Sequence, residues 1–383
     1  MKIKSYIIVG CAFLLMASAM LSGCGKKEET EVSQMTTEAT DSAPTTPTPS
    51  EPLEEPKPSE EPEQNEAANV IPQESIELVQ VPFSGTVRIA APKGAAAYGL
   101  AKLYKENEQM VSRNAYSFTW AQDALEVQDM LINGDADIVL LPSVMAAELN
   151  QITQNQIQGL AVNTLGTLYV LENGNEVVDF KSLKGKRMVI TAWEMGTEPI
   201  LNYIASQNGM MDLSDIHYEW QDDIMQAVDS LVAGDGKLGL LPEPYVSMAM
   251  KQNSELRIAL DLGAVWSETE AADELSMNVV VCSREFAKAN HQEVNAFLDE
   301  YRQSTQYAVA NPEDEADFVA ETGIWPAKED VLSSLERSNL VFLEGLEMKN
   351  TLQTFYQNVD TTWEDSTWKI LPDEAFYYDK TTS

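Results

Sequence analysis

The sequence predicts an α/β protein of two similar lobes, because one strand-to-helix unit occurs twice in it. The segment DMLINGDADIVLLP at residues 129–142 returns as DSLVAGDGKLGLLP at residues 229–242, with seven identities in fourteen positions. Each copy ends a helical pattern at a Gly, runs through a short apolar strand and stops at a Pro. Proline cannot donate to a sheet ladder but suits the first turn of a helix, so each copy predicts a strand followed by a helix.

The segments around this unit repeat with the same spacing. IAAPKGAAAYGL, which begins at Ile89, corresponds to VITAWEMGTEPI, which begins at Val189, and Trp120 closes a strand pattern as Trp220 does. With 383 residues, of which 44% are hydrophobic, the chain is long enough to bury two cores.

Strand patterns alternate with helical patterns in both halves, which is typical of βαβ units around a parallel sheet. In the first half we predict strands at 87–91, 116–120 and 137–141, and helices at 95–105, 123–133 and 143–150. In the second half we predict strands at 217–220 and 237–241, and helices at 197–207, 224–233 and 244–251.

Two apolar strand patterns connect the halves. LAVNTLGTLYVL at 160–171 enters the second lobe, and the pattern at 277–283 leads back from it. A ligand cleft between the lobes follows, because open α/β sheets bind ligands at the carboxyl ends of their strands. The tail is mostly helical, and we expect it to pack on the first lobe. We therefore assign residues 82–177 plus 275–383 to lobe 1 and residues 178–274 to lobe 2.

The N-terminus has the pattern of an export signal. Lys2 and Lys4 precede a short apolar run, and LSGC closes it, which predicts a signal peptide at residues 1–23. LSGC resembles the lipobox of bacterial lipoproteins, and this resemblance implies lipidation of Cys24. Residues 24–80 are acidic and rich in Pro, Ser and Thr, so we expect a disordered stalk there.

Charge and cysteine content exclude several classes of function and structure. The net charge of -36 argues against nucleic acid and against adhesion to anionic lipid. Cys11 lies in the signal and Cys24 at the lipobox, so Cys282 is left alone in an apolar strand pattern. We therefore expect no internal disulfide in the mature chain, and a buried thiol at Cys282.

The order of motifs resembles a known family. After the lipobox and stalk come VRIAAPKGA, GDADIVLLPSV, GLAVNTLGTLYVL, SLKGKRMVIT, LLPEPYVSMAM, LRIALDL and the SREFAKANHQEVNAFLDEYRQS helix pair. Together they are similar to extracytoplasmic solute-binding proteins of ABC importers, in the nitrate, sulfonate, taurine and thiamine-precursor (NitT/TauT, NMT1-like) group.

The resemblance implies a type II periplasmic-binding-protein fold, two α/β lobes joined by a two-segment hinge. It also implies a monomer that captures a small solute and delivers it to an ABC permease and ATPase complex. The expected location is the extracytoplasmic face of the cell membrane, lipid-anchored at Cys24. We expect no cofactor and no metal.

Several candidate ligand-binding residues carry over by position in the family: Lys93, Gly94 and Ala95 in the first strand-to-helix loop, Pro142, Ser143 and Glu243 at the ends of the repeated strands, and Trp193, Glu194, Met195, Gly196 and Thr197 in the equivalent loop of the second lobe. The aromatic residues Trp120 and Tyr245 on the same rims, and Thr164 in the crossing strand, complete the candidate set. Many relatives have a small, Gly-rich sequence where Trp193 and Glu194 stand. Helix N-termini favour an anion or a carbonyl oxygen at these loops.

The charges at these loops allow two ligand classes. Lys93 suits a carboxylate or sulfonate, or is simply solvated. Glu194 and Glu243 either cap helices or accept hydrogen bonds from amino groups. Trp193, Trp120 and Tyr245 offer faces for planar or cationic ligands, although Trp120 also fits a core position. We favour a planar, nitrogen-bearing ligand such as an aminopyrimidine, with an organic anion as the alternative.

An enzyme of the same fold is the competing class. The sequence has only two histidines, His217 and His291, and their spacing is not that of metal ligands. It has no GxSxG, HExxH or GxxxxGK[ST] motif. Because some intracellular enzymes share the fold, fold alone does not exclude catalysis. Export and a tethering stalk favour binding. An adhesion or sensor lipoprotein, the third possibility, would present a flat partner-binding face.

Overall fold

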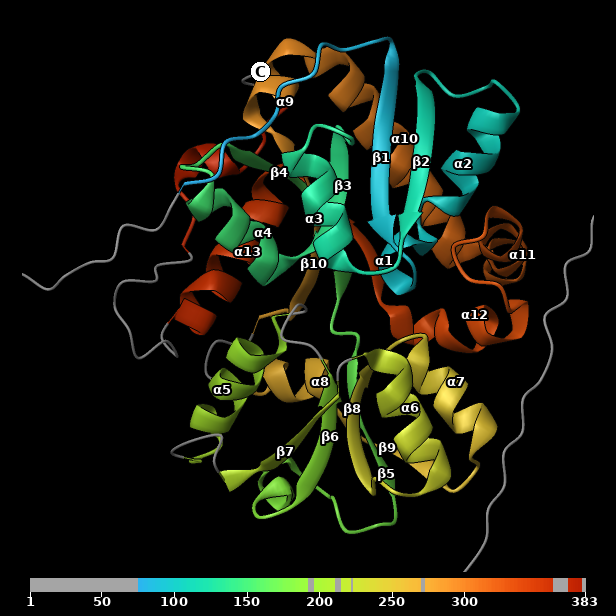
Figure 1. Ribbon diagram of the computed structural model, residues 1–383, viewed down its shortest axis with the longest axis vertical. Coiled ribbons are helices and arrows are strands. Elements are labelled where there is room, and N and C mark those ends of the chain that lie inside the picture. Colours follow the sequence, from blue (N-terminus) through green and yellow to red (C-terminus); the bar gives the residue numbers. More distant parts are fainter. Residues whose placement is uncertain are drawn as a thin grey trace, which may run out of the picture. The chain divides into compact units, whose positions relative to one another are not determined.

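The computed structural model describes residues 75–191, 196–210, 215–221, 223–269, 273–360 and 371–380 (Figure 1). The predicted signal peptide, Cys24 and the stalk up to residue 74 lie outside these ranges. Within them, no helix is both long and apolar enough to cross a membrane.

The first lobe is built on a six-stranded sheet among the described residues, in the order β11-β4-β10-β3-β1-β2. Its strands are β1 (Thr86–Pro92), β2 (Ala115–Ala121), β3 (Ile138–Pro142), β4 (Ile157–Leu165), β10 (Ser276–Ser283) and β11 (Leu340–Leu343). β1 pairs in parallel with β2 and β3, whereas β10 runs antiparallel to β3 and β4.

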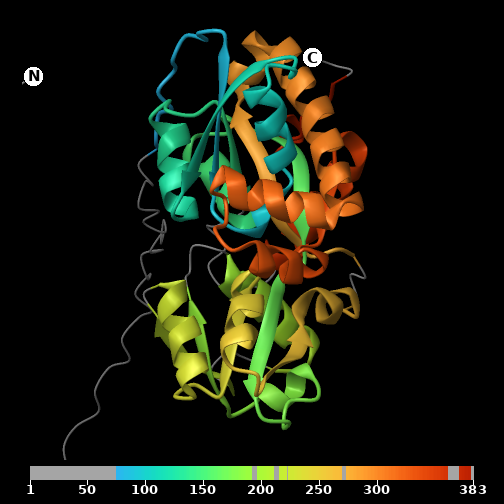
Figure 2. The ribbon, with the colours of Figure 1, turned by 90° about the vertical axis from the view of Figure 1, so that its right-hand side faces the viewer.

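Helices cover both faces of this sheet. α3 lies on one face and α10 on the other, as the two views show (Figures 1 and 2). The helices of this lobe are α1 (Ala95–Tyr98), α2 (Ala101–Glu108), α3 (Ala124–Ile132), α4 (Ser143–Ile152), α9 (Arg284–Ala289), α10 (His291–Ala310), α11 (Pro312–Thr322), α12 (Lys328–Ser334) and α13 (Gly345–Asp360). Short 3-10 helices, η4 (Glu336–Ser338) and η5 (Glu374–Phe376), complete it.

The second lobe has a five-stranded sheet among the described residues, in the order β7-β6-β8-β5-β9. Its elements are β5 (Leu168–Asn173), η1 (Phe180–Leu183), β6 (Arg187–Thr191), α5 (Thr197–Gln207), β7 (His217–Gln221), α6 (Ile224–Ala233), β8 (Leu238–Pro242), α7 (Tyr245–Gln252), β9 (Leu256–Asp261) and α8 (Leu262–Ser267). β6 is parallel to β7 and β8, so the parallel core of the first lobe recurs here.

The duplication reaches the level of single hydrogen bonds. Asp123 caps α3 by accepting the backbone N–H of Glu126, and Asp223 caps α6 by accepting that of Gln226, one hundred positions later. The repeated strands β3 and β8 are each buried along their whole length. A strand buried on both faces reads as a continuous apolar run, which explains the LL-Pro ending of both copies.

The boundary between lobe 1 and lobe 2 comes earlier in the chain than we predicted. We placed the start of lobe 2 at residue 178, but β5 already pairs with β8 and β9 of the second sheet. The apolar pattern at 160–171 is thus two strands in two sheets, separated at Gly166. A Cβ built on Gly166 would lie 2.7 Å from Cα of Gly263, so the close approach of the chain at the hinge requires glycine there.

The helical tail packs on the first lobe as predicted, but it also contacts the second. One apolar cluster joins Phe355 of α13 to Trp266 of α8 and Tyr203 of α5. The ring centroids of Trp266 lie 5.6 Å from Phe355 and 4.6 Å from Tyr203. Cys282 is buried in β10, as expected for a lone apolar thiol, and burial raises the pKa of its thiol.

Candidate functional site

The strand orders place the expected site at one edge of each sheet. A crevice forms outside the carboxyl ends of strands where neighbouring strands send their helices to opposite faces. β1 and β3 are such neighbours, because α1 packs in one apolar cluster and α4 in another. β6 and β8 are their counterparts, with α5 and α7 on opposite faces.

Two equivalent contacts join these edges across the lobes. A Cβ built on Gly94, just before α1, would lie 3.5 Å from Cδ of Pro244, two residues after β8. A Cβ built on Gly196, just before α5, would lie 2.5 Å from Cβ of Val144, two residues after β3. The first loop of each lobe therefore touches the residues that directly follow the repeated strand of the other lobe. The edges at Pro142 and Pro242 face each other.

The first loop of lobe 1 is held by backbone and amide contacts. The backbone N–H of Lys93 donates to the carbonyl of Ala121 at 3.0 Å, and its side chain is half-buried. Gly94 has a φ of 122°, in the left-handed region that favours glycine. Ala95 opens α1 and is buried. The amide of Asn163 in β4 fixes this helix, because its Nδ2 donates to the carbonyl of Ala96 at 2.8 Å.

Ser143 and Thr164 lie at this edge but bond within lobe 1. Ser143 Oγ is 2.9 Å from Ser276 Oγ, and the Ser143 carbonyl accepts from the Tyr356 hydroxyl at 2.9 Å. Thr164 Oγ1 accepts from Nδ2 of Asn278 at 2.8 Å. Both side chains are buried, so they pack beneath this edge of the sheet.

Glu243 forms an ion pair between the lobes. Its carboxylate accepts from Nε of Arg337 at 2.6 Å, and from the backbone N–H and hydroxyl of Ser247 at 3.1 and 3.0 Å. Burial raises the pKa of this carboxyl, and the guanidinium of Arg337 opposes that rise. Glu243 therefore caps α7 and links it to η4, which matches the capping interpretation of this residue.

The aromatic candidates divide between the lobe contact and the core. Tyr245 packs edge-on against Trp325 of the tail, with ring centroids 5.2 Å apart. Trp120 lies on the edge strand β2, donates its indole N–H to the carbonyl of Thr322 at 2.9 Å and packs against Phe118. Trp120 is thus held by packing around α11, the core position that we weighed against a ligand contact.

Trp193, Glu194 and Met195 lie outside the described residues. Their neighbours are described: Gly196 adopts a φ of 63°, and Thr197 opens α5 and is buried. Arg337, Trp325 and Asn163 were not predicted from the sequence. A signal existed for Asn163 alone, because it is a polar residue inside the apolar run LAVNTL. Among the described residues, no group of three or more His, Cys, Asp or Glu could hold a metal ion.

Solved structures with the same architecture are distant in sequence. An ABC transporter protein from Parabacteroides distasonis is 21% identical, with a TM-score of 0.64 over 77% of this chain and 99% of that one. The periplasmic aliphatic sulphonate binding protein SsuA from Escherichia coli is 16% identical, with a TM-score of 0.61 over 77% and 91%. The nitrate-binding protein NrtA from Synechocystis PCC 6803 is 14% identical, with a TM-score of 0.55 over 75% and 84%.

These likenesses establish the fold, that of a periplasmic binding protein with two α/β lobes and a two-segment hinge. No curated protein matches the sequence. The family model described as NMT1/THI5 like matches residues 119–315, which span β3, both crossings and the whole second lobe. The chain therefore belongs to the NMT1/THI5-like family.

Proposed function

We propose that this protein is the solute-binding subunit of an ABC importer. It captures a small solute between its lobes and delivers it to a membrane permease with its ATPase. The observation that carries this proposal is the reciprocal pair of contacts, Gly94 with Pro244 and Gly196 with Val144. Family membership and the solved binding proteins of the same fold support it.

In this proposal the two lobes close on the solute by rotating about the hinge. A ligand shifts a two-state equilibrium only by its difference in affinity for the two states. The first loop of each lobe touches the residues that follow the repeated strand of the other lobe. A solute bound between the lobes therefore contacts both of them only when the lobes lie together. That difference drives closure by a hinge motion at the two crossings.

A planar, nitrogen-bearing molecule such as an aminopyrimidine is our first candidate for the solute. Trp193 and Glu194 support it, since they precede Gly196 at the lobe contact, and aromatic faces and carboxylates suit planar amino-substituted rings. Because the Glu243 carboxylate is already bonded to Arg337 and Ser247, we assign the recognition of amino groups to Glu194.

An organic anion such as a sulfonate or carboxylate is the second candidate. Lys93 at the first loop and the N-terminus of the ten-residue helix α4 favour it. The solved structures of the fold include an aliphatic sulphonate binding protein and a nitrate-binding protein. An anion would contact Lys93, whereas a planar base would contact Trp193.

We also propose that the chain acts outside the cytoplasm, anchored by lipid at Cys24 and working as a monomer without a cofactor. Its role is to bind its solute without chemical change. The LSGC motif and the acidic stalk support the anchor.

Calorimetric titration with a panel of pyrimidines, sulfonates, carboxylates and amines tests this function. We expect one class to bind, and Trp193→Ala to weaken a planar ligand while Trp220→Ala leaves it unchanged. Trp220 is the matched control because it is half exposed on the edge strand β7. If a bound solute is converted to product, the enzyme interpretation replaces ours. Unchanged affinity in Trp193→Ala removes Trp193 from the site.

A further inference from the structure

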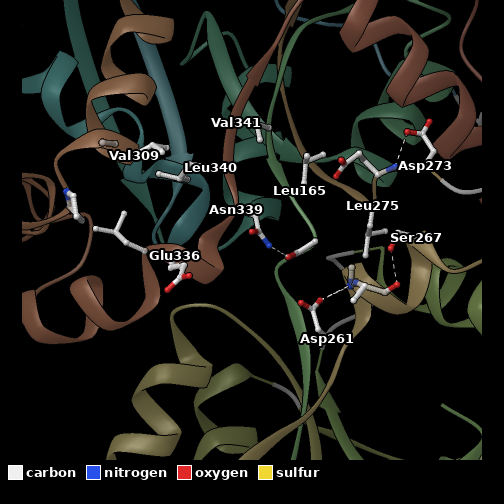
Figure 3. A pocket seen from close by; sticks show the side chains of 17 residues that line it. Leu165, Asp261, Ser267, Asp273, Leu275, Val309, Glu336, Asn339, Leu340 and Val341 are labelled. Atoms are coloured by element: carbon white, nitrogen blue, oxygen red, sulfur yellow. Dashed lines mark hydrogen bonds between the residues drawn. The ribbon is translucent and has the colours of Figure 1, made fainter. Parts of the chain in front are cut away.

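A cavity of about 770 Å³ lies at the hinge (Figure 3). Both crossings border it, through Gly166 on the first and Leu275 on the second. Lobe 1 contributes residues of α10, η4 and β11, and lobe 2 contributes the start of α8. None of the described residues of the loops before α1 and α5 lines this cavity. Its volume falls in the range of pockets for small molecules, roughly 300–1,000 Å³.

Hydrogen bonds between distant segments build the walls of this cavity. Asn339 donates its amide to the carbonyl of Gly166, and the backbone N–H of Gly166 donates to the carbonyl of Leu275 at 2.8 Å. On the lobe 2 side, Asp261 Oδ1 accepts the N–H groups of Gly263 and Ala264 at 2.9 and 3.2 Å. The walls are therefore tied to the two crossings and to both lobes.

The lining combines an apolar wall with carboxylates. Leu165, Leu340 and Val341 lie in the upper middle of Figure 3, with Glu336 to their lower left, Asp273 to their right and Asp261 below them. Glu274 adds a fourth carboxylate, and no Lys or Arg is present among the described lining residues. Arg337 follows Glu336 in the sequence, but its guanidinium is bonded to Glu243. Such a lining attracts a cation and gives apolar surface to its body.

We propose that this cavity is a second ligand site, for a small organic cation with an apolar body. Because its walls come from both lobes and both crossings, an occupant stabilises the arrangement in which they lie together. If the protein binds a solute in the cleft, as proposed above, the two ligands then raise each other's affinity by the same factor.

Titration of the full-length protein in non-ionic detergent with cyclohexylammonium tests the site. Cyclohexanol and cyclohexanecarboxylate serve as neutral and anionic probes with the same apolar ring. We expect the ammonium ion to bind about tenfold more tightly than the alcohol, and we expect the carboxylate not to bind. The three probes share the same ring, so only their charge distinguishes them at an acidic site. Equal binding of the three probes, or no binding of the ammonium ion, would overturn the proposal.

Two variants locate the binding. Ala264→Trp fills the cavity from an exposed position at the start of α8 and should abolish ammonium binding. Asp273→Asn combined with Glu336→Gln should weaken it about tenfold, whereas Glu268→Gln, an exposed acid at the end of α8, should leave it unchanged. If Trp193→Ala weakens ammonium binding and Ala264→Trp does not, the cation occupies the cleft, and the hinge site is wrong while the proposed function stands.

Discussion

At the scale of single residues, Glu315 is an uncompensated buried acid. It lies in α11, its side chain is fully buried, and neither carboxylate oxygen has a hydrogen-bond partner among the described residues. Burial raises the pKa of this carboxyl to about 8, with Lys102 opposing the rise. The folded protein therefore holds a proton on Glu315 at neutral pH that the unfolded chain releases.

Glu315→Gln should change the pH dependence of stability. Between the unfolded pKa near 4.5 and the folded value of about 8, the native chain binds more protons than the unfolded one, so its free energy of unfolding falls as the pH rises. The variant lacks this loss and should be the more stable protein at pH 8, by up to about 5 kcal/mol. Urea unfolding from pH 5 to pH 8 measures the difference.

Glu313→Gln is the matched control for this experiment, because Glu313 is exposed two residues earlier in α11. It should leave the pH dependence of the wild type unchanged. Parallel curves for Glu315→Gln and the wild type would mean that Glu315 is charged in the folded protein.

The pair of Arg337 and Glu243 should stabilise the contact between the lobes. Arg337→Gln leaves the buried Glu243 carboxylate without its charged partner. We expect it to lower the free energy of unfolding by about 2–4 kcal/mol, below the range for fully buried pairs because a third of the Arg337 side chain is exposed. Arg187→Gln, which breaks an exposed pair with Glu219, should cost less than about 1 kcal/mol. Equal losses would refute a special role for Arg337.

Residue identities could be predicted where the chain repeats itself and not where distant segments meet. Gly94, Pro142, Ser143 and Gly196 lie at the facing edges because duplicated loops follow duplicated strands. The partner of Glu243 could not be predicted, because Arg337 stands 94 positions away in a helical tail and nothing in the local pattern points to it. From the sequence, Glu243 could either cap a helix or accept hydrogen bonds from a ligand. Its bonds to Ser247 of α7 and to Arg337 of the tail favour the helix cap.

At the scale of elements, the loops before the first helix of each lobe should limit closure. Gly196→Ala adds a methyl group that would meet Val144, in a backbone conformation that favours glycine. It should weaken binding of a cleft solute by on the order of tenfold, because the lobes no longer approach. Calorimetry with the solute identified from the panel measures this change.

Gly209→Ala separates the two effects of that substitution. Gly209 also has a positive φ, 73°, but nothing lies within 4 Å of a Cβ built there. Gly209→Ala should therefore lower the free energy of unfolding by roughly 1 kcal/mol without weakening the binding of the solute. Equal losses of affinity in both variants would show that backbone strain, and not lobe contact, is responsible.

Most elements follow from hydrophobic patterns, and the exceptions have physical causes. Helices α5 and α6 begin and end where predicted, and β3 and β8 are shifted by one residue. The run at 160–171 contains β4 and β5, because strands buried on both faces carry no alternation that marks a change of sheet. β11 was missed since its four residues pair with β4, far away in sequence. The predicted helix 95–105 breaks at Gly99, where Thr305 of α10 packs closely.

At the scale of the whole molecule, Cys24 should decide whether the protein stays on the membrane. Cys24→Ala removes the only thiol at the lipobox, so the exported chain should move from the membrane fraction to the soluble extracytoplasmic fraction. Cys11→Ala, in the predicted signal peptide, should stay with the membrane. Fractionation and metabolic labelling with a fatty-acid analogue measure both. Membrane retention of Cys24→Ala would contradict the lipid anchor.

The architecture of two lobes could be predicted from the duplication, but the role of the tail could not. α12 contacts α7 through the ion pair of Asp330 with Lys251, at 2.7 Å, and α13 packs against α5 and α8. These contacts form only between segments far apart in the sequence; Lys251 and Asp330, for example, are 79 positions apart. The tail thus adds a third connection to the two crossings, and it holds the lobes in the arrangement that brings the predicted loops together.

The distance between the lobes is the most direct test of the proposal that a solute closes them. Asp129 on α3 and Asp229 on α6 are exposed and occupy equivalent positions in the repeat, so Asp129→Cys with Asp229→Cys places one spin label on each lobe. Pulsed electron paramagnetic resonance then gives the distance distribution with and without a solute that binds. We predict that the solute narrows the distribution to the separation in which Gly94 meets Pro244 and Gly196 meets Val144. A solute that binds tightly and leaves the distribution unchanged would contradict the account.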